Sequence, residues 1–296
     1  MNISEEKRND IIVYEGFLRR AARLPLPFLL KGSFVTRQYF SNPNDRIPND
    51  LDWLYMNPLT GKDETVKALD EWMILVSETA ENDGVQFKSF RENAFWRMID
   101  YAMDDDFPTV NTDLACSLDG ASLYPCQIDV SYNLPVDVSP VPLLYTPLRG
   151  EPFIIPYTVP LALQVSWKLH QSLVRTRFKD LFDLMHLVVH ADFTPEVLQQ
   201  SLRALVKECA KDKTNPARLQ YLLNGNWDAL FKTEEDNIWG FWRYKSAALP
   251  FDDRAESITD RDKLPTTLID FKLQFEDALL TAGFYDLDLR TLHRLI

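Results

Sequence analysis

The 296-residue sequence has little of several residue types, and each shortage argues against a class of protein. Its three cysteines, Cys116, Cys126 and Cys209, form no CxxC pair, and an odd number at wide spacing fits a reducing compartment better than a disulfide framework. The four histidines show no metal-ligand spacing such as HExxH, so we do not expect zinc. No apolar stretch approaches the ~18 residues of a membrane span.

Positive charge is also scarce. The 44 acidic residues outnumber the 32 Lys and Arg residues, and the net charge is −12. Such a chain repels polyanions at long range, so contact with a nucleic acid requires a local basic surface or a brief encounter. The N-terminal MNISEEKRND is charged where a signal peptide would need an apolar core. We therefore expect a cytoplasmic protein with no membrane partner.

What the sequence does have is a hydrophobic content of 46%, enough to bury a sizeable core. Residues 5–24 carry apolar side chains at helical spacing. The following PFLLKGS is a short apolar run that predicts a strand ended by a tight turn at Gly32, and a helix restarts in FVTRQYF.

Two further strand patterns contain aspartates. DLDWLYM alternates polar with apolar residues before becoming fully apolar, which predicts a strand with Asp50 and Asp52 at its polar end. After an amphipathic helix around Val66 to Glu81, the runs NTDLACSLDG and SLYPCQIDVSYN predict two more strands, with Asp119-Gly120 as the turn of a hairpin. Asp129 lies in the second of these strands.

The second half of the chain has a helical pattern. A proline-rich link, residues 134–160, leads to a long helical pattern from about Leu161 to His190, and three later segments also have helical spacing. We predict an α+β protein: residues 1–150 form a domain with a mixed sheet flanked by helices, and residues 151–296 form a mostly helical domain.

The Gly32-Ser33 pair is the first candidate for chemistry. Gly32 can adopt a backbone conformation that turns Ser33 and nearby amides toward a phosphate, and a helix that starts there adds its N-terminal partial positive charge. Taken alone, such a pair is usually only a turn.

Three aspartates are candidates for a metal site. In a strand, Asp50 and Asp52 point to the same face and can share a hard cation such as Mg²⁺, or Mn²⁺ in its place. Magnesium takes its other oxygens from water and substrate phosphates, so this geometry invites a nucleoside triphosphate. Asp129 joins them if its strand is a neighbour; the alternative is a turn cap and two exposed strand residues.

The long helical pattern supplies cations. Lys168 and Arg175 fall within a narrow polar stripe, with Asp183 near it and Asp180 on its flank. One interpretation has Lys168 and Arg175 binding triphosphate oxygens while Asp180 or Asp183 orients a base. The other is a solvated face with an Arg175, Lys179 and Asp183 charge ladder.

Together these residues resemble the AbiEii/AbiGii-type nucleotidyltransferase toxins, a family that includes the MenT toxins and belongs to the DNA polymerase β-like superfamily. The resemblance runs from about Phe28 to Val188. It lies in Lys-Gly-Ser, then Arg46 with Asp50-Leu-Asp52, then QIDV, then WKLHQSLVRTRFKDLFDL. The chain departs at Lys31, where the family usually has glycine, and at Pro48, where it has serine.

The resemblance implies a nucleotidyltransferase fold and a Mg²⁺-dependent enzyme, the toxin of a phage-defence type of toxin–antitoxin system. It implies that Asp50, Asp52 and Asp129 bind the metal, and that Gly32, Ser33, Lys168, Arg175 and Asp183 bind nucleotide, with Lys168 and Asp180 also catalytic. The donor would be an NTP, and the acceptor RNA such as the tRNA 3′ end, or a protein. For tRNA, five arginines are candidates for a basic groove: Arg19, Arg20, Arg23, Arg37 and Arg46.

Two other functions stay open from the sequence. The chain could be a catalytically silent relative that senses nucleotide or docks a partner protein, which Pro48 permits. It could also bind polyanions by stacking bases on the aromatic run IWGFWRYK, with Trp239, Phe241, Trp242 and Tyr244 as platforms and Arg243 and Lys245 on phosphates. An aromatic cluster of this kind is more often part of a core.

Overall fold

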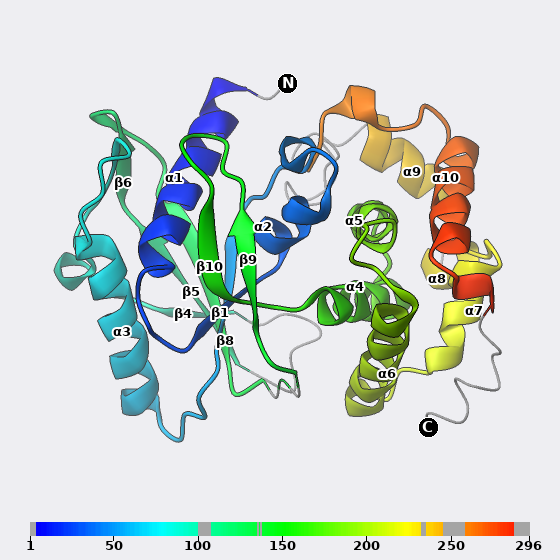
Figure 1. The fold of residues 1–296 in the computed structure, drawn as a ribbon, viewed down its shortest axis with the longest axis horizontal. Helices are drawn as coiled ribbons and strands as arrows, with labels where there is room; N and C mark the ends of the chain where they lie inside the picture. Colours follow the sequence, from blue (N-terminus) through cyan, green and yellow to red (C-terminus); the bar gives the residue numbers. More distant parts are fainter. Residues whose placement is uncertain are drawn as a thin grey trace. The chain divides into compact units, whose positions relative to one another are not determined.

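The computed structural model describes residues 4–99, 108–134, 136, 138–231, 235–244 and 258–286. The chain divides into two compact units. Unit 1 comprises Met1–Gln38 and Pro48–Val159, and unit 2 comprises Tyr39–Ile47 and Pro160–Ile296. Unit 1 contains a mixed sheet with helices, and unit 2 is helical (Figure 1), which confirms the predicted α+β class.

Unit 1 is built on a seven-stranded sheet with the order β4-β5-β8-β2-β1-β10-β9. Unit 1 also contains a second sheet of three strands, with the order β3-β6-β7. The strands are β1 (Phe28–Lys31), β2 (Leu51–Tyr55), β3 (Val85–Phe87), β4 (Arg97–Ile99), β5 (Thr109–Leu114), β6 (Cys116–Leu118), β7 (Ala121–Ser122), β8 (Cys126–Tyr132), β9 (Val141–Tyr145) and β10 (Phe153–Thr158).

The strands of Asp52 and Asp129 are neighbours, so the condition that the sequence left open is met. β2 lies between β1, to which it is antiparallel, and β8, to which it is parallel. The hairpin between β6 and β7 turns at Asp119 and Gly120, whose φ angles of 49° and 85° are those of a type I′ turn.

Helices α1 (Glu5–Ala21) and α3 (Lys62–Glu78) supply one side of the core of unit 1. Phe17 of α1 and Trp72 of α3 both pack on Trp53 of β2, and the Trp72 ring stacks on Phe28 with centroids 3.9 Å apart. Because side chains alternate along a strand, the neighbours Asp52 and Trp53 point to opposite faces of the sheet. The aspartate face is therefore the face away from this aromatic core.

The proline-rich link predicted over residues 134–160 is wrong, because most of it is a pair of strands. β9 and β10 form an antiparallel hairpin, and β10 also pairs with β1. Pro142 is tolerated because β9 is an edge strand, and Pro156 lies where the register between the two strands shifts. The division between the units consequently falls between Val159 and Pro160, and residues 39–47 belong with the second unit.

Unit 2 consists of helices in its described residues. They are α4 (Leu161–Val174), α5 (Phe178–Val188), α6 (Pro195–Asp212), α7 (Leu219–Leu223), α8 (Asp228–Phe231), α9 (Glu235–Tyr244) and α10 (Leu268–Thr281). Short 3₁₀ turns are η2 (Pro43–Asp45), η4 (Pro216–Arg218), η8 (Arg261–Lys263) and η9 (Phe284–Asp286), and unit 1 contains η3 (Phe90–Glu92).

The single helix predicted from Leu161 to His190 is also wrong. α4 ends at Val174, and Arg177, with an extended backbone at φ −135°, precedes α5. Apolar residues continue at helical spacing on both sides of the break, so periodicity alone cannot reveal it. The break removes the predicted ladder of Arg175, Lys179 and Asp183 and lets α5 pack back on α4.

The aromatic run of α9 is part of the core of unit 2. Trp239 and Trp242 are 4% and 3% exposed and pack on Phe178 and Phe271. Arg243 donates to the carbonyl of Pro265. This confirms the core interpretation over base stacking for these residues; Phe241 and Lys245 lie outside the described side chains, as do the acidic residues 104–106.

Candidate active site

A row of polar residues crosses five neighbouring strands of the large sheet. Lys31 of β1 is the register partner of Asp52 of β2, which is the partner of Asp129 of β8. The row continues through Asn111 of β5 to Arg97 of β4. Register partners point to the same face of a sheet, so Asp52 and Asp129 are adjacent carboxylates on one face.

Asp129 is held in place by amide groups. Its side chain is buried at 2% exposure, and its Oδ1 accepts hydrogen bonds from Asn111 Nδ2 and, at 3.4 Å, from Gln127 Nε2. Arg97 in turn donates to Asn111 Oδ1 from Nε at 3.1 Å, which orients the amide so that its nitrogen faces Asp129. Arg97 also pairs with Asp113 at 2.7 Å.

Asn111, Gln127 and Arg97 were not predicted from the sequence. The available signal was a polar residue inside an apolar strand: Asn111 is 4% exposed in β5, where an unsatisfied amide would be costly. Such a residue requires a partner, but the sequence does not say which strand supplies it.

Asp52 lies against the Gly32 turn. Gly32 has φ +74°, a conformation that L residues rarely adopt, and a Cβ at this position would clash with Asp52 Oδ2. Two separate reasons thus require glycine here: the backbone angle and the space that the carboxylate occupies. Lys31 Nζ lies 3.4 Å from Asp52 Oδ1, on a carboxylate that is 26% exposed.

Ser33 begins a shorter helix than the sequence predicts. α2 (Ser33–Thr36) has a single turn and continues as the 3₁₀ turn η1 (Arg37–Tyr39), so its dipole contributes little. The Ser33 hydroxyl is buried, and within the described part of the chain it has no hydrogen-bond partner. A buried hydroxyl of this kind costs free energy unless a ligand satisfies it.

Asp50 lies at the edge of the strand. β2 begins at Leu51, so Asp50 immediately precedes its first residue. Burial, with a smaller contribution from the charge of Asp50, raises the pKa of Tyr14. The Tyr14 hydroxyl donates to the carbonyl of Asn49 at 2.8 Å.

The donor set fits a cation that keeps part of its shell for other oxygens. Among the described residues, no three Asp, Glu, His or Cys side chains converge as a ready-made metal cage. Asp52 and Asp129 provide two carboxylates, and magnesium is commonly held by one or two of these plus substrate phosphates and water. The missing Cβ of residue 32 leaves room for the Asp52 carboxylate, which is 26% exposed.

Lys168, one of the two predicted cations of unit 2, lies in a charged cluster of that unit. Lys168 Nζ of α4 lies 2.7 Å from Asp180 Oδ1 and 2.9 Å from Asp183 Oδ2, both on α5. Arg177 Nε pairs with Asp180 at 2.6 Å, and Arg46 binds Asp183 through Nε at 2.6 Å and a second nitrogen at 3.2 Å. Three cations thus surround two carboxylates.

The charges of this cluster stabilise one another. Burial opposes ionisation of Asp180, but Arg177 and Lys168 outweigh it and hold its pKa well below the usual value. Asp183 behaves likewise, with Arg46 and Lys168 lowering its pKa. Burial also opposes the charge of Lys168, yet the two aspartates raise its pKa.

Asp180 and Asp183 are fully buried at 0% exposure, whereas the Lys168 side chain is 12% exposed and Arg175 is exposed. With their oxygens bound to cations, the two aspartates position Lys168, Arg46 and Arg177. Of the four site residues predicted in the helical pattern of unit 2, Lys168 and Arg175 are therefore the two that solvent can reach.

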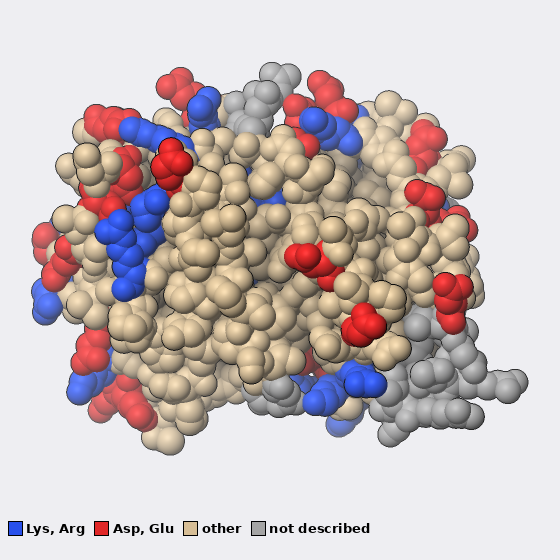
Figure 2. All heavy atoms as spheres, viewed as in Figure 1, with Lys and Arg blue, Asp and Glu red and all other residues tan. Residues whose placement is uncertain are grey.

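The basic groove predicted from five arginines does not form. Arg37 is fully buried and pairs with Glu15 at 2.7 Å, Arg20 is buried on Asp83, and Arg46 is buried on Asp183. Arg23 pairs with Glu81, and Arg19 donates to the carbonyl of residue 151. On the face drawn in Figure 2, basic side chains of unit 1 lie beside acidic ones.

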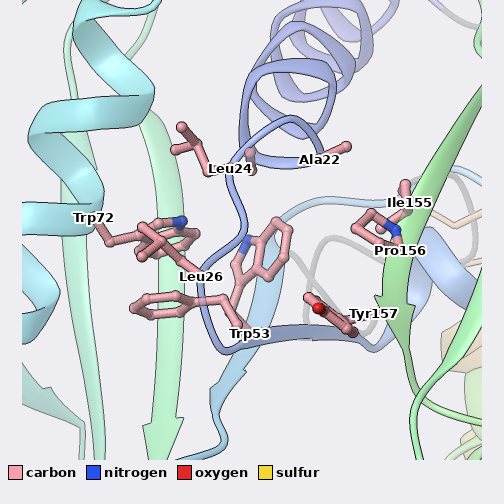
Figure 3. A pocket seen from close by; sticks show the side chains of 10 residues that line it. Ala22, Leu24, Leu26, Trp53, Trp72, Ile155, Pro156 and Tyr157 are labelled. Atoms are coloured by element: carbon pink, nitrogen blue, oxygen red, sulfur yellow. The ribbon is translucent and has the colours of Figure 1, made fainter.

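A small cavity in unit 1 lies away from the carboxylates. It is lined by Trp53, Trp72, Tyr157 and neighbouring apolar residues (Figure 3), and its volume is about 10 Å³. A single water needs roughly this much space. This cavity is too small for a nucleotide, and it lies on the face of β2 opposite Asp52.

A Gly-Ser turn beside a strand aspartate, with a second aspartate on the neighbouring strand, is the arrangement that the resemblance to nucleotidyltransferases implied. The fold agrees: the chain is similar to MenT4, a nucleotidyltransferase toxin from Mycobacterium tuberculosis, with a TM-score of 0.57 at 15% identity over 99% of this chain and 89% of that one. The sequence matches the family described as Nucleotidyl transferase AbiEii toxin, Type IV TA system, over residues 16–273. This chain therefore belongs to the AbiEii nucleotidyltransferase toxin family.

The family membership confirms the resemblance seen in the sequence and makes the protein a transferase of a toxin–antitoxin class. No curated protein matches the chain. None of the helices in the described residues combines the length and apolar character needed to cross a membrane.

Proposed function

We propose that this protein is a Mg²⁺-dependent enzyme that transfers a nucleoside monophosphate from an NTP to an acceptor hydroxyl. The observation that carries the proposal is the pairing of Asp52 with Asp129 on adjacent strands, beside a glycine whose missing Cβ leaves Asp52 room. Asp52 and Asp129 hold the metal, and Asp50, two residues away, is the third proposed ligand. Mn²⁺ is expected to substitute.

The bound metal would neutralise charge that develops on the transferred phosphate and on the leaving pyrophosphate. The acceptor oxygen forms a bond to the α-phosphorus, and the bond from that phosphorus to the α,β-bridging oxygen breaks. Pyrophosphate leaves with the electron pair, and one carboxylate of the pair accepts the hydroxyl proton. Ser33 would donate its buried hydroxyl to a phosphate oxygen.

In unit 2, we propose that Lys168 and Arg175 bind phosphate oxygens of the nucleotide. What supports this is the excess of cations over carboxylates around Lys168 and the access of solvent to both side chains. Asp180 and Asp183 act by holding Lys168 at a fixed position, so their proposed contribution to catalysis and nucleotide binding is indirect.

The proposed acceptor is RNA, such as the 3′ end of tRNA, and a protein hydroxyl is the second candidate. The family description supports a toxin that acts together with an antitoxin. We propose that the protein acts in the cytoplasm as the toxin of a phage-defence system. The acidic net charge and the engaged arginines favour a brief contact with RNA over a stable complex.

The test is transfer of label. The purified chain is incubated with Mg²⁺, total cellular tRNA and each α-labelled NTP in turn, and Asp52→Asn serves as the inactive control. We expect a labelled RNA band with one or more nucleotides that the variant does not give. Label on protein would change the acceptor, and absence of label with every nucleotide would favour the alternative, a relative that binds nucleotide or a partner protein without transfer.

A further inference from the structure

Lys31 is a cation placed on the carboxylate that the proposed function assigns to the metal. It ends β1, its register partner is Asp52, and its Nζ lies 3.4 Å from Asp52 Oδ1. The Lys31 side chain is 18% exposed. We propose that Lys31 is the resident counter-ion of Asp52 and that it exchanges this carboxylate for a phosphate group of the substrate when the metal binds.

The need for a counter-ion follows from the sheet. Asp52 and Asp129 are register partners on adjacent strands, and like charges directly opposite each other destabilise a sheet. Asn111 and Gln127 supply neutral donors to Asp129, whereas Lys31 supplies a positive charge to Asp52. Before a divalent cation arrives, the ammonium of Lys31 therefore reduces the repulsion between the two carboxylates.

The contact is of a kind that can exchange. Charge-assisted N⁺–H···O⁻ bonds are usually about 2.7–2.9 Å long, so 3.4 Å is a loose contact. Lys168 in unit 2 shows the contrast, because its Nζ lies 2.7 Å and 2.9 Å from two fully buried carboxylates. A metal ion can therefore displace Lys31 from Asp52 at a much lower cost in free energy than it could displace Lys168 from its two aspartates.

The turn at Gly32 offers the released Lys31 ammonium a neighbouring place to bind phosphate. Lys31 is followed by Gly32, and the next residue is Ser33, whose buried hydroxyl lacks a partner within the described residues. A lysine carries three donors on a flexible four-carbon stem, which suits binding to phosphate oxygens. Lys31 and Ser33 would then bind the same anionic group from the two sides of the turn.

The inference rests on the proposed metal site and predicts two changes of opposite sign. Lys31→Met keeps the length of the side chain and removes its charge. Without the competing ammonium, Mn²⁺ should bind the full chain about fivefold more tightly. In the presence of saturating Mg²⁺, inorganic tripolyphosphate should bind about fivefold more weakly or worse, because a phosphate contact is lost.

The measurements are electron paramagnetic resonance titration of free Mn²⁺ and calorimetric titration of tripolyphosphate. Lys31→Arg should leave both affinities close to the wild type. Lys88→Met removes a surface lysine that pairs with Glu92 and controls for the change in net charge. Should Lys31→Met fail to fold, as seen by circular dichroism, Lys31→Gln takes its place.

Any pattern other than the two opposite shifts overturns the inference, including unchanged Mn²⁺ affinity or unchanged tripolyphosphate affinity. Asp52→Asn separates this outcome from failure of the proposed function. If Asp52→Asn loses Mn²⁺ while Lys31→Met gains none, the metal site stands and only the role of Lys31 is lost. If Asp52→Asn binds Mn²⁺ as the wild type does, the metal site itself is wrong.

Discussion

The charged cluster around Asp183 in unit 2 and the polar row around Asp52 in unit 1 both pair aspartates with basic residues, yet they are built differently. In unit 2, Asp180 and Asp183 are fully buried and bound by three cations at 2.6–3.2 Å. In unit 1, Asp52 is partly exposed and has one loose contact with Lys31. Carboxylates whose oxygens are all bound to cations stabilise the fold around them, whereas a carboxylate with one weak partner is available to bind a ligand.

The largest difference should appear in activity. Asp52→Asn removes charge at the proposed metal site without changing shape, and we expect nucleotide transfer to fall by about 10³-fold or more while the midpoint of thermal unfolding does not decrease. The control is Asp119→Asn, in a hairpin turn that also accepts asparagine, where only a solvent-exposed ion pair with Arg149 is lost. Loss of activity in the control, or full activity in Asp52→Asn, would contradict the assignment.

The second prediction concerns stability instead of activity, at an aspartate of the unit 2 cluster. Asp183→Asn leaves Arg46 and Lys168 buried with one carboxylate fewer, which should lower the free energy of unfolding by about 3–5 kcal/mol. Denaturant unfolding of the wild type, this variant and Asp192→Asn, an exposed aspartate of the same unit, measures it. A stability equal to that of the Asp192→Asn control would show that the cluster is not structural.

A third prediction concerns the residues behind Asp129. Asn111→Ala removes the amide that links Arg97 to Asp129, and outer-shell partners of this kind typically contribute about 10–100-fold to metal affinity or activity. We expect Mn²⁺ affinity and transfer to fall together within this range. If neither falls in a folded variant, Asp129 does not depend on Asn111 for its position.

The smallest predicted effect is a pH dependence of stability. The pKa of Asp183 is lowered in the folded state from its ordinary 3.8, so its contribution is fully present above pH 3.8 and is lost as the pH falls toward the folded value. The stability gap between wild type and Asp183→Asn should therefore shrink below about pH 4. A gap that is constant between pH 6 and pH 3 would contradict the ion pairing.

Much of unit 1 could be predicted because each strand carries its own signal. PFLLK is an apolar run, DLDWLYM alternates, and Asp119-Gly120 has a strong preference for a hairpin turn. The β9 and β10 strands were missed because proline usually marks a loop, and only an edge position or a shifted register tolerates it. These two conditions are tertiary and leave no local trace.

The candidate site was predictable in its residue types but not in its partners. Asp52, Asp129 and Lys168 are predicted site residues, and the first two lie on adjacent strands, which is the condition the sequence left open. The role of Asp183 was not predictable, because it depends on a break after Val174 and on Arg46, 137 residues earlier in the chain. Ion pairs over such separations are set by packing rather than by local sequence.

One affinity separates the two clusters: that of the full chain for Mn²⁺ without nucleotide, measured for the wild type and Asp52→Asn. Because Asp52 and Asp129 are the proposed metal ligands, the wild type should bind Mn²⁺ and the variant should bind it at least about tenfold more weakly. Equal affinity of the two folded proteins would contradict the central claim that this carboxylate pair, rather than the saturated cluster of unit 2, is the catalytic centre.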